Sequence, residues 1–134
     1  MKTSLHKDLG SGGWHSSVMT TFSVDPAFYD AYIERRLRRH GCENNLLLAD
    51  AAMLTRAAQA TPDAFRSAGR RYAVVPVSTV GCFHPKIHLR LGSDRARLIV
   101  GSANATAAGW CRNLEVLADV DWRPRDEAQA LGPL

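Results

Sequence analysis

The stretches that decide the fold of this chain are CFHPKIHL at residues 82–89, VGSAN at residues 100–104 and NLEV at residues 113–116. Alternate residues of an extended strand face the same way, so His84 and Lys86 are predicted to project side by side. A histidine is a good nucleophile or proton carrier near neutral pH. A neighbouring lysine supplies the positive charge that a phosphoryl oxygen needs in its transition state. The first stretch therefore favours chemistry on a phosphate group.

The other two stretches supply polar residues that could complete such a site. Ser102 and Asn104 leave a strand through a turn at Gly101, where small polar side chains can bind oxygens. Glu115 could accept a histidine N–H and hold the tautomer of the ring, as a carboxylate does in a catalytic triad. Plainer interpretations exist, because Ser102 and Asn104 could cap a helix and Glu115 could be an ordinary strand acid. An H-x-K pair alone would be incidental, and its combination with G-S-x-N favours a site.

The combined pattern of H-x-K, G-S-x-N and a following acidic residue resembles the half-site of the phospholipase D superfamily. The similarity spans about residues 20–120, and the segment TTFSVDP at residues 20–26 is also similar to prokaryotic nuclease-like members. The resemblance implies an α/β fold, a phospholipase D-like half-domain whose mixed β-sheet is flanked by helices. It implies that Gly101 contacts the substrate. The catalytic residues that it implies are His84, Lys86, Ser102, Asn104 and Glu115.

The resemblance also implies a reaction that needs two such half-sites. One histidine attacks phosphorus and forms a phosphohistidine, while the histidine of the other half-site protonates the leaving oxygen and then activates water. Lysine and asparagine side chains hold the non-bridging oxygens, so no metal and no cofactor are expected. The chain departs from the family pattern at Leu91, where an aspartate often follows the lysine by five residues. This departure argues mildly against a lipid-cleaving member.

Hydrophobic periodicity and turn residues outline alternating strands and helices. Strands are expected at residues 17–22, 46–49, 72–80, 87–91, 95–100 and 114–122. One helix is expected to start at Pro26, capped by Asp25, and to end near Gly41. Further helices are expected at residues 51–60 and 103–110. This alternation predicts an α/β domain with a mixed sheet.

Length and composition fit one domain with a core of its own. The chain has 134 residues, of which 46% are hydrophobic and 22% charged. We expect a flexible leader over residues 1–13, a phospholipase D-like domain over residues 14–122 and a polar tail over residues 123–134. No apolar run suits a signal peptide or a membrane span, and the three widely spaced cysteines favour neither a disulfide framework nor zinc. A cytoplasmic protein without a membrane partner is therefore predicted.

The charge of the chain suits a polyanionic partner. The formal net charge is +4 and the pI about 9.3, so nucleic acid, either DNA or RNA, is the expected substrate. Arg90 and Arg112 lie near the motif and are candidate substrate contacts. The run RRLRR at residues 35–39 is interpreted as a solvated helix end rather than a DNA-binding surface. His88 is interpreted as a packing or supporting residue.

These features together predict a metal-independent phosphodiesterase, a nuclease that acts through a phosphohistidine. The chain holds one H-x-K and one G-S-x-N, so the simplest complete site is a homodimer that brings His84 of both chains to a shared cleft. Alternatively, the chain is a fragment that lacks a second half-domain. Two further functions stay open, namely a phospholipase or phosphatidyltransferase of the same superfamily and a non-catalytic half-domain that binds nucleic acid.

Overall fold

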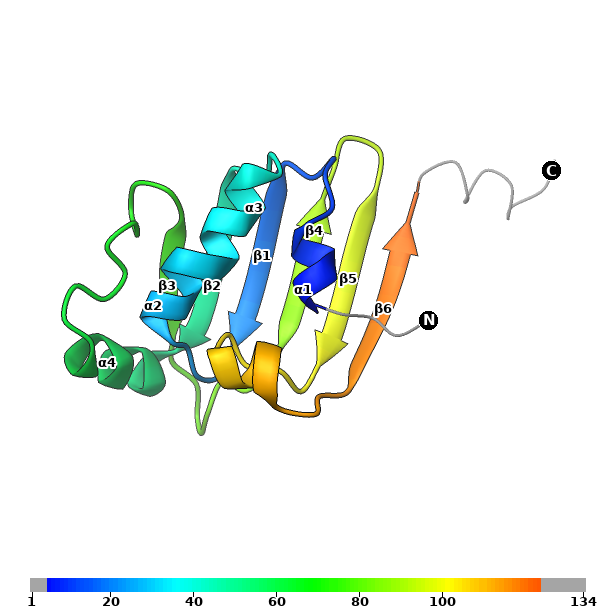
Figure 1. The fold of residues 1–134 in the computed structure, drawn as a ribbon. Coiled ribbons are helices and arrows are strands. Elements are labelled where there is room, and N and C mark those ends of the chain that lie inside the picture. The colour runs from blue at the N-terminus through cyan, green and yellow to red at the C-terminus, as the bar shows by residue number, and fades with distance from the viewer. Residues whose placement is uncertain (1–4, 124–134) are drawn as a thin grey trace, which may run out of the picture.

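A mixed six-stranded sheet forms the centre of the molecule (Figure 1). The structure, a computed structural model, describes residues 5–123. The strand order is β3-β2-β1-β4-β5-β6, with β1 to β3 parallel and β4 to β6 each antiparallel to the preceding neighbour. The fold class that the sequence predicted is therefore confirmed. The strands are β1 (Ser16–Thr21), β2 (Asn44–Asp50), β3 (Ala73–Val77), β4 (Ile87–Leu91), β5 (Ala96–Gly101) and β6 (Leu117–Trp122).

Helical segments connect the strands and lie over one side of the sheet (Figure 1). They are α1 (Leu5–Leu9), α2 (Pro26–Phe28), η1 (Tyr29–Glu34), α3 (Arg35–Arg39), α4 (Ala51–Ala60) and η2 (Ala108–Arg112). The segments α2, η1 and α3 follow one another without a break and form the long helix that the sequence predicted, with a π-helical middle. Asp25 caps this helix by accepting a hydrogen bond of 3.0 Å from the Phe28 N–H. The predicted helix at residues 103–110 is instead the short η2, five residues further on.

The N-terminal segment differs from the flexible leader that the sequence predicted. Residues 5–9 form α1, and the Leu9 side chain is fully buried in the hydrophobic core. Asp8 of the same helix forms ion pairs with Arg90 and Arg97 on the sheet. The expectation was wrong because a Gly-Ser-rich stretch directly after α1 dominated the local signal, while the partners of α1 lie far along the chain. The predicted polar tail lies, from residue 124 on, outside the described residues.

The two faces of the sheet have different surroundings. Residues paired across neighbouring strands share a face, so the register assigns each side chain to one of them. One face, which we name the covered face, lies against the helices and holds buried residues such as Met19, Leu47, His88 and Ile99. The opposite face, the open face, has no buried and no charged member short of Asp50, the last residue of β2, which pairs with Val77. It comprises Ser16, Val18, Thr20, Asn44, Leu46, Leu48, Ala73, Val75, Ile87, Leu89, Leu91, Ala96, Leu98, Val100, Ala118, Val120 and Trp122.

The strand directions also define two edges. The carboxyl ends of β1, β2 and β5 and the start of β4 meet at one edge, which we name the site edge (Figure 1). The opposite edge holds the starts of β1 and β2, the end of β4 and the last turn of α3. The motif residues that follow β5 and precede β4 are thereby brought to the site edge from distant parts of the sequence.

Candidate active site

His84 and Lys86 lie together in the loop that leads into β4. Strand β4 begins at Ile87, one residue after the lysine. His84 and Lys86 therefore do not lie within a strand, although their side chains were expected to project as in one. The Lys86 Nζ nevertheless lies 2.8 Å from the His84 Nδ1 and 2.9 Å from the His84 carbonyl oxygen. The Nζ also lies 3.1 Å from the His84 Nε2, and because an ammonium group only donates, a ring nitrogen that bonds to it acts as the acceptor. The structure thus places an imidazole and an ammonium group in direct contact.

The loop that carries this pair is held by residues that the sequence reasoning missed. The Asp50 carboxylate caps α4 by accepting from the Ala52 and Met53 N–H groups, and it also accepts from the Phe83 N–H at 2.9 Å. These backbone hydrogen bonds, that from Phe83 foremost, lower the pKa of Asp50. The sequence shows an aspartate before a helix, which is a cap signal, but it holds no signal for the second bond to a distant loop.

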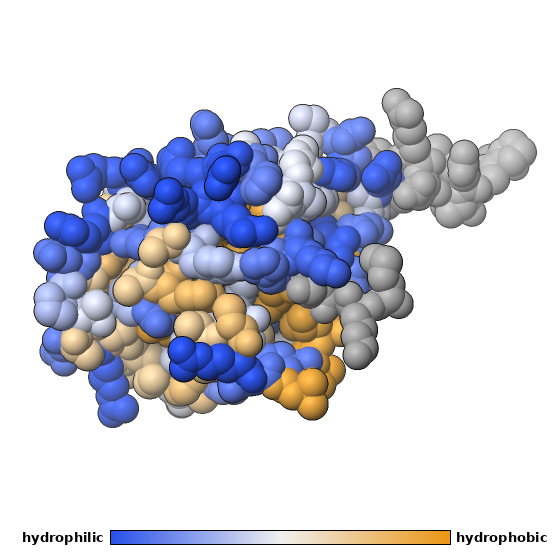
Figure 2. Space-filling model, viewed as in Figure 1, coloured by the Kyte–Doolittle hydropathy of each residue, from blue (hydrophilic) through white to orange (hydrophobic). Residues whose placement is uncertain are grey.

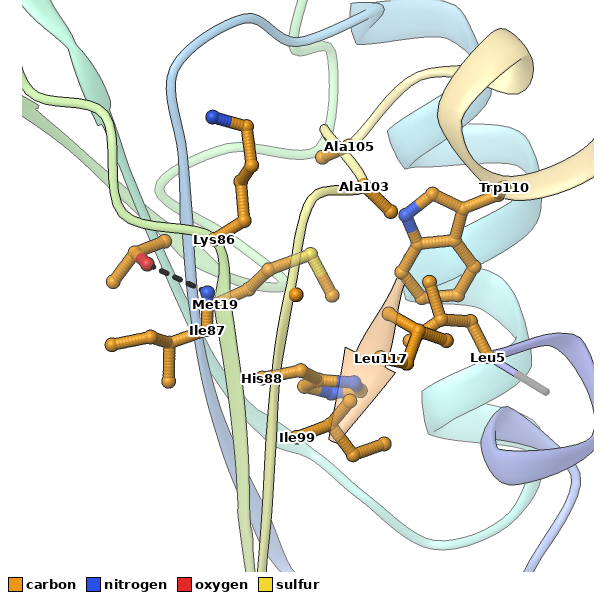
Figure 3. A pocket seen from close by; sticks show the side chains of 12 residues that line it. Leu5, Met19, Lys86, Ile87, His88, Ile99, Ala103, Ala105, Trp110 and Leu117 are labelled. Carbon is orange, nitrogen blue, oxygen red and sulfur yellow. Dashed lines mark hydrogen bonds between the residues drawn. The ribbon is translucent and has the colours of Figure 1, made fainter. Parts of the chain in front are cut away.

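Two residues of the β1 end complete the support. The Thr20 hydroxyl donates to the Pro85 carbonyl at 3.0 Å. It also accepts from the Ile87 N–H at 3.0 Å, the bond that the dashed line at Ile87 marks in Figure 3. The Phe22 ring packs against the His84 imidazole with ring centroids 4.8 Å apart. Together these contacts fix the loop on both sides of the histidine.

Asn104 is oriented by the end of β1. Its side-chain oxygen accepts from the backbone N–H groups of Phe22 and Ser23, both at 3.3 Å. Two backbone donors settle which end of the amide is the oxygen, so the Nδ2 amino group is directed elsewhere as a donor. A donor with this fixed orientation suits a non-bridging phosphate oxygen.

Ser102 and Glu115 form a second pair. The Ser102 hydroxyl donates to the Glu115 carboxylate and accepts from the Val116 N–H at 3.0 Å. The predicted bond from a histidine to Glu115 is absent from residues 5–123. The register pairs Leu117 with Gly101 and so sets Val116 opposite Ser102, whose N–H donates to the Val116 carbonyl. Glu115 is the next residue, and its carboxylate is engaged by the Ser102 hydroxyl in place of a histidine.

Gly101 has a structural role at the end of β5, and its predicted contact with substrate stays a prediction. A Cβ at this position would lie 2.4 Å from the Val116 carbonyl oxygen and from Leu117, so only glycine fits where β5 and β6 approach. Its N–H donates to the Lys86 carbonyl at 3.0 Å and joins the two motif stretches.

Arg90 is not a substrate contact. Its side chain is only 1% exposed, it forms an ion pair with Asp8, and its guanidinium lies 5.0 Å from the centroid of the Trp14 ring. The prediction failed because Arg90 lies on the covered face, beneath α1. Arg112, by contrast, is exposed at the end of η2, so its predicted contact with substrate stays a prediction.

A small cavity lies beneath Lys86 (Figure 3). Burial is the main cause that lowers the pKa of Lys86, and the charges of Cys82 and Glu115 oppose this shift. His88 and Ile99 lie on the floor of the cavity and Trp110 on its far side. His88 is 4% exposed, and burial, followed by the charges of Arg90 and Arg97, lowers its pKa to about 3. His88 is therefore a neutral packing residue, as predicted.

The part of the chain that the structure describes holds no cluster of three or more His, Cys, Asp or Glu side chains that could bind a metal ion. Within residues 5–123, no helix has the length and apolar character needed to cross a membrane.

Comparison with known proteins gives a fold but no match in sequence. No protein-family profile matches this chain, and no curated protein matches it. Yeast tyrosyl-DNA phosphodiesterase shares the fold at a TM-score of 0.64 and 13% identity, over 90% of this chain and 29% of that enzyme. Nuc from Salmonella typhimurium, a phospholipase D family member, has a TM-score of 0.60 and 21% identity, over 94% and 78% of the two chains. NucT from Helicobacter pylori has a TM-score of 0.61 and 14% identity, over 95% and 80%.

The chain therefore has the fold of the phospholipase D superfamily, as the sequence motifs predicted. It spans less than a third of the length of the yeast enzyme. It spans about four fifths of the length of the two shorter relatives.

Proposed function

We propose that this chain is a metal-independent phosphodiesterase, and specifically a nuclease that acts through a phosphohistidine. The observation that carries the proposal is the contact of 2.8 Å between the Lys86 Nζ and a ring nitrogen of His84. A lone pair and a cation at this spacing suit attack on a phosphorus whose oxygens bear negative charge.

In the proposed reaction, a phosphoryl oxygen replaces the imidazole as the partner of Lys86. The freed ring nitrogen of His84 attacks phosphorus, and the bond from phosphorus to the leaving oxygen breaks. A second histidine gives its proton to that oxygen. It then accepts a proton from water, whose oxygen attacks phosphorus and breaks the phosphorus–nitrogen bond. The Asn104 amino group donates to a non-bridging oxygen throughout, held by the backbone of residues 22 and 23.

The second histidine is proposed to come from a second copy of the chain. The described residues contain one H-x-K with one G-S-x-N, so a complete site needs two half-sites. Exposed apolar side chains occur in the loops beside the motif residues, where Val80 is 110%, Leu114 101% and Val116 77% exposed. Apolar residues in this position suit an interface between two copies that meet at the site edge.

The test combines solution mass with cleavage assays in excess chelator. We expect a dimer that cleaves DNA or RNA without metal, and we expect His84→Ala to lower the rate by several orders of magnitude. His40→Ala, at the opposite edge, is the matched control and should keep full activity. Mixed dimers of wild type and His84→Ala should be nearly inactive, because each would hold one histidine. Activity that chelator abolishes and magnesium restores would contradict the mechanism.

The single half-site also favours a second candidate, a non-catalytic half-domain that binds nucleic acid. An inactive monomer that binds DNA or RNA would support this candidate over the nuclease. Cleavage of phosphatidylcholine vesicles in place of nucleic acid would instead support a phospholipase.

A further inference from the structure

Two basic segments meet at the edge of the sheet opposite the candidate site. The guanidinium of Arg38 in α3 donates a hydrogen bond of 3.1 Å to the backbone carbonyl of Arg71, which precedes β3. Figure 2 shows hydrophilic residues gathered along the upper side of the molecule, the side on which α3 ends in Figure 1. We name this surface the arginine edge. It comprises Arg35, Arg36, Arg38, Arg39, Arg70 and Arg71.

The nearby carboxylates leave most of this charge without a counterion. Glu34 is buried and engages Arg38 at 2.7 Å, while Asp30 accepts the hydrogen bond of the Tyr72 hydroxyl. Asp63 lies 3.7 Å from Arg66, which is outside the arginine edge. Glu43 lines the same surface hollow as Arg38 and offsets one charge.

Arg36 is half-buried, and its guanidinium lies 5.9 Å from the centroid of the Tyr32 ring. The remaining members of the edge are Arg35, Arg39, Arg70 and Arg71. All four are exposed and form no ion pair within residues 5–123. The helix dipole favours cations in the last turn of α3, but it gives no reason for Arg70 and Arg71, which lie in a separate turn. Like charges brought together by two segments destabilise a fold unless an anion binds between them.

Two hollows border this cluster and give it a shape for an extended anion. One is lined by Arg38, Arg70 and Arg71 with the starts of β1 and β2. The other lies on a different side of α3, beside Arg35, Arg39 and the Tyr32 ring. A guanidinium group can donate two parallel hydrogen bonds to the oxygens of one phosphate. An aromatic ring beside it offers a surface on which a base can stack.

We propose that the arginine edge binds the phosphodiester backbone of a nucleic acid strand whose cleaved phosphate lies at the site edge. This inference rests on the proposed function. The six residues of β1 separate the two edges by about 20 Å, at about 3.3 Å per residue. A strand that advances about 3.4 Å per nucleotide covers this distance in about six nucleotides. Substrates of more than about six nucleotides can therefore contact both edges, and shorter ones contact only the site.

The test uses two double variants of the full chain, Arg35→Gln with Arg39→Gln and Arg70→Gln with Arg71→Gln. The matched control is Arg66→Gln with Arg123→Gln, which removes the same charge from an arginine paired with Asp63 and from one beyond β6. Binding is measured across a salt series in the His84→Ala background, with DNA and RNA strands of about 20 nucleotides as separate arms. Each arginine-edge variant should bind roughly tenfold more weakly, with a salt slope lowered by about two. The control should bind as the parent does.

Hydrolysis of bis(p-nitrophenyl) phosphate, measured in the chains that retain His84, separates this inference from the proposed function. If the arginine edge serves only long strands, its variants should hydrolyse the small diester as fast as wild type. Unchanged strand binding in both arginine-edge variants, or an equal loss in the control, would overturn the inference. Loss of strand binding in a chain that hydrolyses no diester would uphold strand binding at the arginine edge and refute the nuclease. Hydrolysis of the small diester, together with unaltered strand binding in the arginine-edge variants, would support the nuclease and refute the inference.

Discussion

The two faces of the sheet reverse the usual distribution of polar and apolar residues in their β4 to β6 half. On the covered face, Asp8 of α1 forms ion pairs with Arg90 and Arg97, and Arg97 also pairs with Asp119. On the open face, Leu89, Leu98 and Val120 pair across the same three strands without a charged neighbour. An antiparallel sheet more commonly buries its apolar side and exposes its polar one. The comparison teaches that what lies over a strand decides which of its residues are buried.

The largest expected effect concerns the ion pair of the covered face. Burial raises the pKa of Asp8 and lowers the pKa of Arg90, so each charge depends on the other. Asp8→Asn leaves the Arg90 charge buried without its carboxylate, and we expect a loss of about 3–5 kcal/mol in the free energy of unfolding. Asp121→Asn, which removes a 57% exposed partner of Arg97, should cost less than about 1 kcal/mol in the same urea titration. Equal losses would show that burial of the Asp8 pair has no energetic consequence.

A smaller difference is expected between two leucines, one on each face. Leu47 on the covered face is 0% exposed, and Leu98 on the open face is 37% exposed. Leu47→Ala should cost about 2–5 kcal/mol, because the truncated side chain leaves a cavity in the core. Leu98→Ala should cost less than about 1 kcal/mol, because water already reaches that side chain. Chemical denaturation of the two variants measures both values. A larger loss at Leu98 would show that something covers the open face in solution.

The smallest effect is the pH dependence that His88 brings to the covered face. Its pKa is about 3 in the folded chain and about 6.5 when unfolded, so the unfolded state binds more protons below pH 6.5. The stabilising contribution is complete above pH 6.5 and decreases as the pH falls, by about 1.4 kcal/mol per unit, toward pH 3. Between pH 6.5 and 5, wild type should therefore lose about 2 kcal/mol more than His88→Leu. Parallel stability profiles for the two proteins would contradict the neutral, buried state of His88.

The sequence predicted the strands and the meeting of the motif stretches because both have local signals. The alternation of apolar and polar residues over 87–100 predicts two antiparallel strands. The H-x-K and G-S-x-N motifs lie at the end of this strand pair that carries the candidate site. The same alternation misplaced Arg90, since a pattern of apolar and polar residues does not reveal which side α1 covers. The partner of Glu115 likewise depends on the register of β6, which pairs residues that no local spacing relates. Asp50 and Asn104 orient distant backbone segments, and such contacts exist only in the folded chain.

The position of α1 has a consequence for how the protein is made. Asp8 and Leu9 leave the ribosome long before β4 and β5, the strands that supply Arg90 and Arg97. The parallel strands β1, β2 and β3 can pair while synthesis continues, and α1 can contact η1 through His6 and Tyr32. The ion pairs of Asp8, however, cannot form until the hairpin of β4 and β5 has emerged. Contacts between segments this distant slow folding. The Asp8 carboxylate therefore does not have both arginine partners until synthesis has passed Arg97, which makes the closing of α1 onto the sheet a late step of folding.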